Sequence, residues 1–281
     1  MKATYLWNRF RQSSYGLVGL ILLAVILMVA AFAPFIAPYK PNELTNDLLA
    51  PPSFKHFLGT DHLGRDVFSG VVYGSRVSLL VGVTAAIISA ILGTMIGALA
   101  GYTGGIVDEL ISKFVDIFLM IPTFFLILIV VVLYGNSLFY IMLVIGGTIW
   151  PANARLMRAQ ALTLRERAFV KAAITLGESQ FRILLKHIIP NGIYPIIANT
   201  TLQMAGAILT EAGLSFLGLG DPNTPSWGKM IFEGRSYIQT AWWTSFFPGS
   251  AIVLTVMAFY FIGDGLNFAL NPKLKEKGAW E

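Results

Sequence analysis

The chain has 281 residues, of which 56% are hydrophobic and 12% are charged, and its mean hydropathy is +0.69. Soluble domains carry about 25% charged residues, so this composition excludes a single water-soluble domain and indicates an integral membrane protein. The net charge of +5 is explained by cytoplasmic loops rich in Lys and Arg rather than by nucleic-acid binding. With no cysteine and three scattered histidines, neither a metal site nor a cofactor is expected.

Six segments are apolar enough and long enough to cross a membrane as helices, which takes about 20 residues each. They are residues 16–37, 77–101, 114–134, 138–159, 192–217 and 248–270. The fourth segment turns polar after Pro151. The sequence therefore predicts an all-α integral membrane protein, with a six-span domain over 16–270 between the terminal segments 1–15 and 271–281.

The basic residues divide unevenly between the two sides of such a protein. Fourteen of the 20 Lys and Arg residues lie on one side: at the two termini, between the second and third spans, and in or just before the segment between the fourth and fifth spans. The other six lie on the opposite side. Lys and Arg accumulate in cytoplasmic loops. Both termini and residues 160–191 are therefore predicted to be cytoplasmic, the loops 38–76 and 218–247 external, and the protein a multi-pass protein of the cell membrane.

The second span carries small residues at every fourth position, namely Ser89, Gly93, Gly97 and Gly101. Small residues at this spacing let helix backbones approach closely in lipid. We therefore expect other helices to cover this stripe, a pattern that suits a channel, a transporter or a membrane enzyme equally.

The segment between the fourth and fifth spans is predicted to form two short amphipathic helices. Thr163 and Glu166 fit a capping box for the first helix. Gly177 is a natural stop, because glycine adopts the left-handed conformation without penalty. Apolar residues at helical spacing form the face of the first helix, at Phe169, Ala172, Ala173 and Leu176. Pro190 is expected to end the second helix, whose apolar face comprises Phe181, Leu184, Leu185 and Ile188.

Two interpretations of this basic, amphipathic segment remain open from its residues. It can rest on anionic lipid as an interfacial helix pair, or it can dock a soluble cytoplasmic partner. The paired alanines favour docking, because they are too small to anchor in lipid and suit a helix that another surface approaches closely.

This segment also resembles the EAA signature of permease subunits in binding-protein-dependent ABC importers. The matching pattern is Ala172-Ala173, three residues, Gly177, and a run to Ile189-Pro190. The resemblance implies that the segment is a coupling helix, which inserts into a groove of the ATP-hydrolysing subunit.

The resemblance assigns roles to individual residues of the segment. Docking of the ATPase subunit is assigned to Ala172, Ala173, Leu176, Gly177, Glu178, Ser179 and Phe181. The ending HIIPN is similar to the dipeptide, oligopeptide and nickel branch, and the end of the segment is assigned to His187, Pro190 and Asn191. Lys171 and Ile174 depart from the family pattern, which has Glu and often Arg at these positions.

The resemblance covers most of the chain, because residues 51–79, 211–231 and 261–272 also match C-type permeases of this branch. Asn267 and Phe268 stand where an Arg-Asp pair is usual. The resemblance implies the type I importer permease fold. The implied partners are a homologous B-type permease, two ATP-binding subunits, an extracytoplasmic substrate-binding protein and membrane lipid, with no nucleic acid. The implied cargo is di- or oligopeptides, with oligosaccharides or nickel complexes as the alternative.

Three acidic residues lie within or at the ends of the predicted spans, at Asp116, Glu211 and Asp264. A charge in mid-bilayer costs about 2.5–3.5 kcal/mol on insertion scales, so each needs a partner, water or a proton. Glu211 is the candidate for a polar lining of a translocation path, and a buried packing contact is the alternative for all three. They are also the coupling residues that an ion-driven secondary transporter needs, but the sequence shows no convincing internal repeat of the kind such folds often have.

Enzymatic chemistry has little support in this sequence. Asp61, His62 and Asp66 lie in a turn-rich external loop, where adjacent side chains point apart, so no metal site is expected there. In GLSFLG, residues 213–218, the second glycine falls one position too late for a nucleophile elbow, which argues against an intramembrane hydrolase. No Gly-x4-Gly-Lys-Ser/Thr motif occurs, so ATP binding by that route must come from a partner.

Overall fold

The computed structural model describes residues 3–270, and this part of the chain is helical, with loops and no β-strand. The long helices are α2 (Ser14–Ala31), α4 (Val67–Thr103), α5 (Gly105–Met120), α6 (Thr123–Tyr134), α7 (Leu138–Arg165), α10 (Ile189–Phe216) and α12 (Trp243–Leu270). The short elements are α1 (Ala3–Phe10), α3 (Ala33–Ile36), α8 (Ala168–Thr175), α9 (Gln180–Ile183), the π-helical turn η1 (Leu184–Ile188), α11 (Trp227–Gly234) and the 3-10 turn η2 (Arg235–Tyr237). The predicted tail 271–281 lies outside the described residues.

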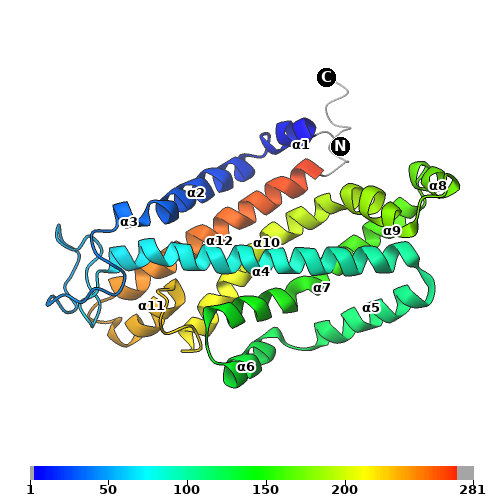
Figure 1. Ribbon diagram of the computed structural model, residues 1–281. Coiled ribbons are helices and arrows are strands. Elements are labelled where there is room, and N and C mark those ends of the chain that lie inside the picture. The colour runs from blue at the N-terminus through cyan, green and yellow to red at the C-terminus, as the bar shows by residue number, and fades with distance from the viewer. Residues whose placement is uncertain (1–2, 271–281) are drawn as a thin grey trace.

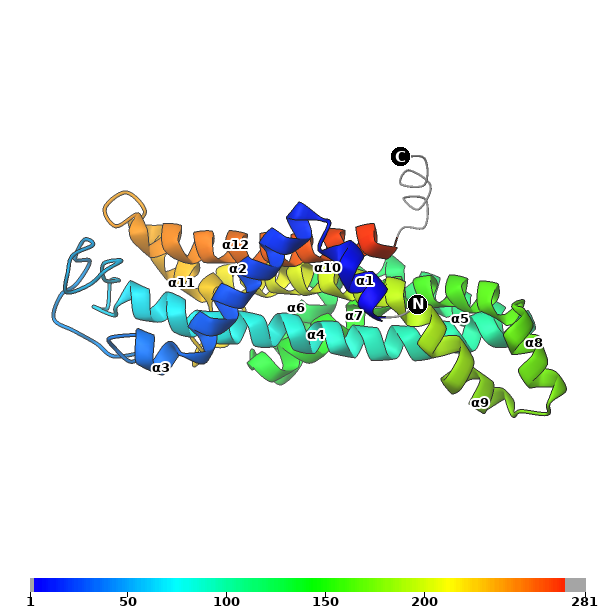
Figure 2. The ribbon, with the colours of Figure 1, turned by 90° about the horizontal axis from the view of Figure 1, so that it is seen from above.

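The long helices run side by side in an elongated bundle, with α4 extending along its middle (Figure 1). The helices α8 and α9 project beyond one end of the bundle (Figure 2). α1 lies toward that same end, and α12 finishes there, whereas the loop after α3 and helix α11 lie at the opposite end. The predicted coupling segment and the two ends of the described chain therefore share one side of the bundle.

The helices α2, α4, α5–α6, α7, α10 and α12 lie where the six spans are predicted, but the first predicted span, 16–37, is interrupted at Phe32 between α2 and α3. Within residues 3–270, three helices are long and apolar enough to cross a membrane by themselves, α2, α4 and α12, and the α5–α6 pair counts as a fourth if it is one span. α7 and α10 have 28 residues each, about 42 Å at 1.5 Å per residue. Length alone therefore lets them cross, and for these two helices the span remains a prediction.

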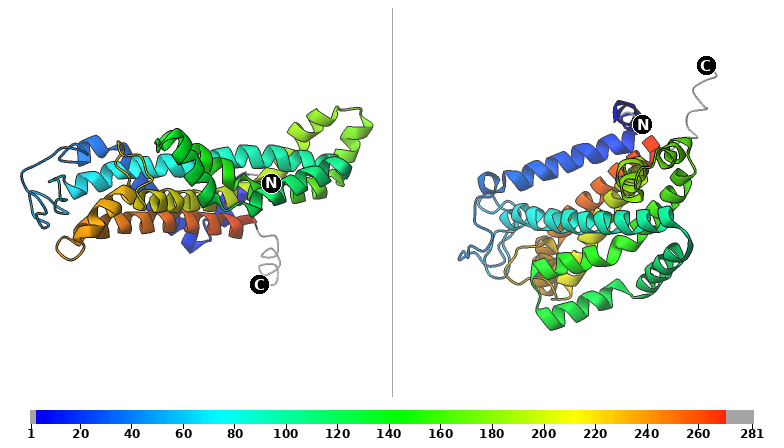
Figure 3. Two further views of the ribbon diagram at one scale, coloured as in Figure 1. Left: turned by 90° about the horizontal axis from the view of Figure 1, so that it is seen from below. Right: turned by 45° about the vertical axis from the view of Figure 1, so that its right-hand side comes forward.

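The third span is not the continuous helix over 114–134 that the sequence predicts. It breaks between Met120 and Thr123, and the two halves, α5 and α6, meet at an angle of 77° (Figure 3). The residue before a proline is sterically disfavoured in the helical conformation, and Ile121, which precedes Pro122, is extended at φ −83° and ψ 118°. α6 has 12 residues, about 18 Å, which is too short to cross a bilayer core alone.

The second span begins earlier than predicted. α4 starts at Val67, so residues 67–76, expected in the external loop, form its first turns. The Asp66 carboxylate caps this helix by accepting a hydrogen bond from the Ser69 N–H at 2.7 Å. The range 38–76, predicted as an external loop, therefore includes the first turns of a helix.

The small-residue stripe of α4 packs against α7, as the sequence predicts. A Cβ added to Gly97 meets the Ala154 carbonyl oxygen at 2.2 Å, and one added to Gly93 meets the Trp150 carbonyl oxygen at 2.7 Å. Gly101 faces the Arg158 carbonyl oxygen in the same way, at 2.4 Å. The two backbones therefore touch along the stripe, and only glycine fits at these positions.

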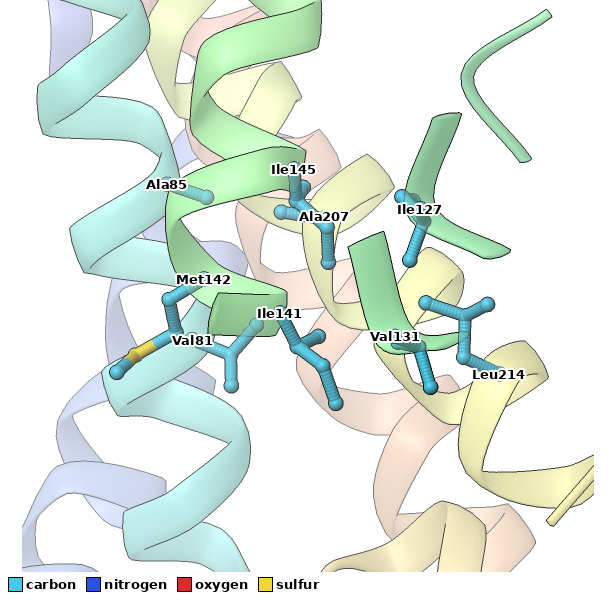
Figure 4. Packing of buried hydrophobic residues seen from close by; sticks show 9 residues of the cluster. All are labelled: Val81, Ala85, Ile127, Val131, Ile141, Met142, Ile145, Ala207 and Leu214. Carbon is cyan, nitrogen blue, oxygen red and sulfur yellow. The ribbon is translucent and has the colours of Figure 1, made fainter. Parts of the chain in front are cut away.

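An apolar core joins α4, α6, α7 and α10 (Figure 4). Its members are Val81, Ala85, Ile127, Val131, Ile141, Met142, Ile145, Ala207 and Leu214. Ile127 and Val131 hold the short α6 against the bundle. Although the third span is broken, its second half, α6, is thus packed against the bundle along one face.

The loop between α3 and α4 is ordered by polar contacts, and its three candidate metal ligands do not meet. Asp61 binds the Arg65 guanidinium, with Nε to Oδ2 at 2.6 Å, whereas the His62 ring stacks on Tyr237. Asp66 bonds the buried His56 ring, with Oδ2 to Nδ1 at 3.0 Å. No group of three potential ligands that could hold a metal occurs among residues 3–270.

Candidate functional site

The first helix of the predicted coupling segment, α8, ends at a glycine bend, as expected. Gly177 has φ +78°, the left-handed region that favours glycine. Its N–H bonds the Ile174 carbonyl at 3.0 Å, and the next N–H, of Glu178, bonds the Ala173 carbonyl at 3.1 Å. These two bonds form a Schellman motif, and a Cβ on Gly177 meets nothing within 4 Å. Backbone conformation, not space, therefore requires glycine here.

The predicted start of this helix is wrong. α7 continues through Arg165, and α8 begins only at Ala168, so Thr163 lies inside α7 and caps nothing. The Thr163 hydroxyl instead donates to the Ala159 carbonyl of its own helix at 3.1 Å. Glu166 accepts from the Lys171 ammonium at 3.1 Å, and this hydrogen bond lowers the pKa of the Glu166 carboxyl.

Pro190 does not end the second helix. α9, the π-helical turn η1 and α10 follow one another without a loop, and Pro190 lies in the first turn of α10. The π-helical turn directly precedes it, so proline here forgoes one backbone hydrogen bond without ending the helix. In the π-helical turn the Ile189 N–H bonds the Leu184 carbonyl, five residues back. The coupling segment therefore continues directly into the fifth predicted span.

The side chains of the bend connect α8 to the helix that follows. His187 Nε2 and Glu178 Oε2 lie 3.1 Å apart, and the His187 ring also contacts Phe169, at 6.3 Å between ring centroids. The Ser179 hydroxyl caps α9 by accepting from the Arg182 N–H at 3.4 Å. Asn191 donates to the His187 carbonyl at 2.7 Å. The residues assigned from the EAA signature therefore form one connected element.

The two alanines of the signature differ in exposure. Ala172 is exposed, whereas Ala173 is buried with Val170 in the chain's own core, against Ile183 and Ile188. The prediction that the Ala173 side chain contacts a partner is therefore not supported in this conformation. Its small size instead lets α8 pack closely on the start of the fifth span.

The tip of the segment exposes large apolar side chains beyond the end of the bundle (Figure 2). Leu176 is 82% exposed and Phe181 is 67% exposed, on either side of the glycine bend. Apolar side chains that extend beyond the packed helices offer a contact surface to another molecule. Of the predicted docking residues, Ala172, Leu176, Gly177, Ser179 and Phe181 are exposed.

Glu211, the candidate for a path lining, is 1% exposed in α10. Its Oε1 accepts from the Ser215 hydroxyl at 2.6 Å, and Ser215 in turn accepts from Ser226, which caps α11. In this conformation the carboxyl group packs α10 against α11 and faces no open path.

A buried polar cluster between three helices was not predicted from the sequence. Asn153 of α7 donates to Gln203 Oε1 of α10 at 2.8 Å and to Ser89 Oγ of α4 at 3.2 Å. It accepts from Asn199 at 2.9 Å and also bonds the Thr200 hydroxyl. The polar residues of the fourth predicted span after Pro151 indicate that this part of the helix is not surrounded by lipid alone, but the sequence does not show which residues they contact.

Comparison with known proteins identifies the family of this chain. Residues 93–276 match the binding-protein-dependent transport system inner membrane component family, and residues 4–52 match the N-terminal transmembrane domain of oligopeptide transport permease C. The chain belongs to the family of binding-protein-dependent transport system inner membrane components, and its fold is the type I ABC importer permease fold. It is therefore a multi-pass membrane component of a transporter.

Individual relatives align along almost the whole chain. The dipeptide transport system permease protein DppC of Escherichia coli K12 is 46% identical, with 96% of this chain and 93% of the relative covered. The di/tripeptide transport system permease protein DppC of Pseudomonas aeruginosa is 40% identical, with 96% and 91% covered. A solved structure of the MetNI methionine ABC transporter matches with a TM-score of 0.54 over 72% of this chain and 97% of that chain, at 19% identity. This structural likeness supports the fold alone.

Proposed function

We propose that this protein forms half of the membrane path of an ABC importer for di- or oligopeptides and couples that path to ATP hydrolysis in partner subunits. The similarity to DppC proteins over almost the full chain supports the peptide class. Oligosaccharides or nickel complexes are the alternative cargo for the same machinery. The proposed partners are a homologous B-type permease, two ATP-binding subunits and an extracytoplasmic substrate-binding protein.

The single observation that carries the coupling role is the projecting tip at the glycine bend. It places Leu176 and Phe181, both largely exposed, beyond the end of the bundle, where a soluble subunit has access. The division of basic residues supports a cytoplasmic position for this end. A path that alternates between two openings needs ATP and the loaded binding protein to favour different states, because a ligand shifts an equilibrium only by its differential affinity.

Replacement of both exposed apolar side chains tests this role. In the double variant Leu176→Ser/Phe181→Ser, the ATP-binding subunits should co-purify with the permease at least about tenfold less, because the buried contact at the tip is lost. Phe54→Ser is the control, since Phe54 is likewise an exposed aromatic residue but lies in the loop after α3, at the opposite end. Unchanged co-purification of the double variant would favour the lipid-resting interpretation of the tip and reject docking.

A further inference from the structure

A cleft of about 270 Å³ lies between α4, α5 and α7. Its walls combine small residues with charged ones, which leaves both space and polarity in the cleft. The small residues are Gly97, Ala100 and Ala154, and the charged residues are Asp116, Arg155 and Arg158. No step of the docking role described above uses this cleft.

Two ion pairs connect α5 and α7 beside this cleft, and they differ in exposure. Arg158 binds Asp108 through two hydrogen bonds of 2.5 and 2.7 Å, and the Asp108 side chain is mostly buried. Arg155 binds Asp116 through Nη2 to Oδ1 at 2.6 Å, but these side chains are 58% and 53% exposed. The first pair holds the two helices together, whereas the second remains open to a third charged group.

The exposed pair lies just inside the predicted cytoplasmic ends of the third and fourth spans. Asp116 is eleven residues into α5, about 16 Å along the helix axis, and both residues fall within the predicted third and fourth spans. Charged side chains inside spans face the bundle interior or a water-filled cavity, because exposure to lipid is costly. An exposed pair at this end of the spans, next to a cleft, therefore indicates a water-filled space that opens toward the cytoplasm rather than a lipid-facing surface.

We propose that this cleft is a section of the translocation path and that Asp116 and Arg155 transiently bind the charged ends of a peptide. The inference rests on the proposed peptide importer function. The ammonium end of a peptide pairs with the Asp116 carboxylate, and its carboxylate end takes the Arg155 guanidinium, whose planar fork suits bidentate binding. Each charge of the protein exchanges one partner for another, so none is left unpaired while the peptide passes.

Uptake of radiolabelled dialanine tests the pair in proteoliposomes that contain the complete importer, its binding protein outside and ATP inside. We expect Asp116→Asn and Arg155→Gln each to slow uptake at least about fivefold, with the complex still assembled. Lys113→Gln is the matched control, because Lys113 forms an equally exposed pair with Glu109 on the same helix, away from the cleft. Uptake at the wild-type rate in both variants would overturn the binding role of the pair. Failure of the wild-type importer to take up dialanine would instead count against the proposed peptide function.

A second measurement does not depend on the charged pair and covers the case in which those variants fail to assemble. Ser112 lines the same cleft, and the chain has no other cysteine once Ser112→Cys is introduced. A charged methanethiosulfonate reagent should label this cysteine in the complex, since thiolate forms only where water reaches it, and millimolar dialanine should slow labelling severalfold. Ile21→Cys, on the exposed apolar face of α2, should not be labelled. Absent labelling of Ser112→Cys, or labelling unaffected by dialanine, would refute a path through this cleft.

Discussion

Replacement of Gly97 by alanine probes the closest helix contact of the bundle. The added Cβ lies 2.2 Å from the Ala154 carbonyl oxygen and 2.9 Å from its Cα, whereas ordinary contact begins near 3.4 Å. α4 and α7 must therefore separate by about 1.2 Å. Overpacking by a methyl group costs about 1–3 kcal/mol, and the upper end applies here, because a backbone atom of a helix cannot rotate away.

The measurement is thermal unfolding of the purified protein in detergent. A loss of about 3 kcal/mol lowers Tm by about 6–12 °C for a chain of this size. Gly147→Ala is the matched control on α7, because nothing lies within 4 Å of its added Cβ, and alanine is the better helix former by about 1 kcal/mol. Equal Tm values for the two variants would show that the backbones do not touch as described. Ala154→Gly should not rescue Gly97→Ala, because the atom in conflict is a backbone oxygen.

Three further predictions concern the bend, the buried cluster and the topology. Gly177→Val should abolish co-purification of the ATP-binding subunits, because the left-handed conformation costs a β-branched residue about 1–3 kcal/mol. Gly177→Asn should retain most of the co-purification. Equal loss in both variants would show that docking does not depend on the left-handed conformation. Asn153→Ala should lower the free energy of unfolding by about 1–2 kcal/mol, since it removes the Asn153 acceptor of Asn199 and one of the two donors to Gln203 Oε1, and no change in denaturant midpoint would exclude a stabilising cluster. An impermeant thiol reagent applied to intact cells should label Ser53→Cys and not Thr175→Cys; the reverse result would invert the predicted orientation.

The features that the sequence predicted well are those set by local spacing. The stripe at Gly93, Gly97 and Gly101 repeats every four residues, so one helix face is defined whatever covers it. Gly177 was predicted as the bend because few other residues adopt positive φ. The long apolar helices follow from composition, since an apolar segment in lipid must pair its own backbone groups and does so as a helix.

The features that were missed depend on what a residue meets in three dimensions. The hydropathy of residues 114–134 does not reveal the break between α5 and α6, because Ile121 and Pro122 are both apolar. The break arises from the backbone, since proline disfavours the helical conformation of the residue before it. Proline at position 190 predicts a helix end, yet the helix continues through it from the π-helical turn η1 into α10. Periodicity placed Ala172 and Ala173 on one face, but it cannot distinguish the chain's own core from a partner's surface, and only Ala173 is buried in that core.

The unbroken helical run from Gln180 to Phe216 has a mechanical consequence. Its 37 residues follow the helix axis for about 55 Å with no intervening loop, and the π-helical turn η1 and Pro195 lie within the run. When the run moves as one body, a tilt of about 5° at one end displaces the other end by up to about 5 Å. That far end is seated on α11 through the contact of Ser215 with Ser226. Coupling between two sites is reciprocal. Binding that displaces the α11 end of the run therefore also displaces the projecting tip, and binding at the tip displaces the α11 end.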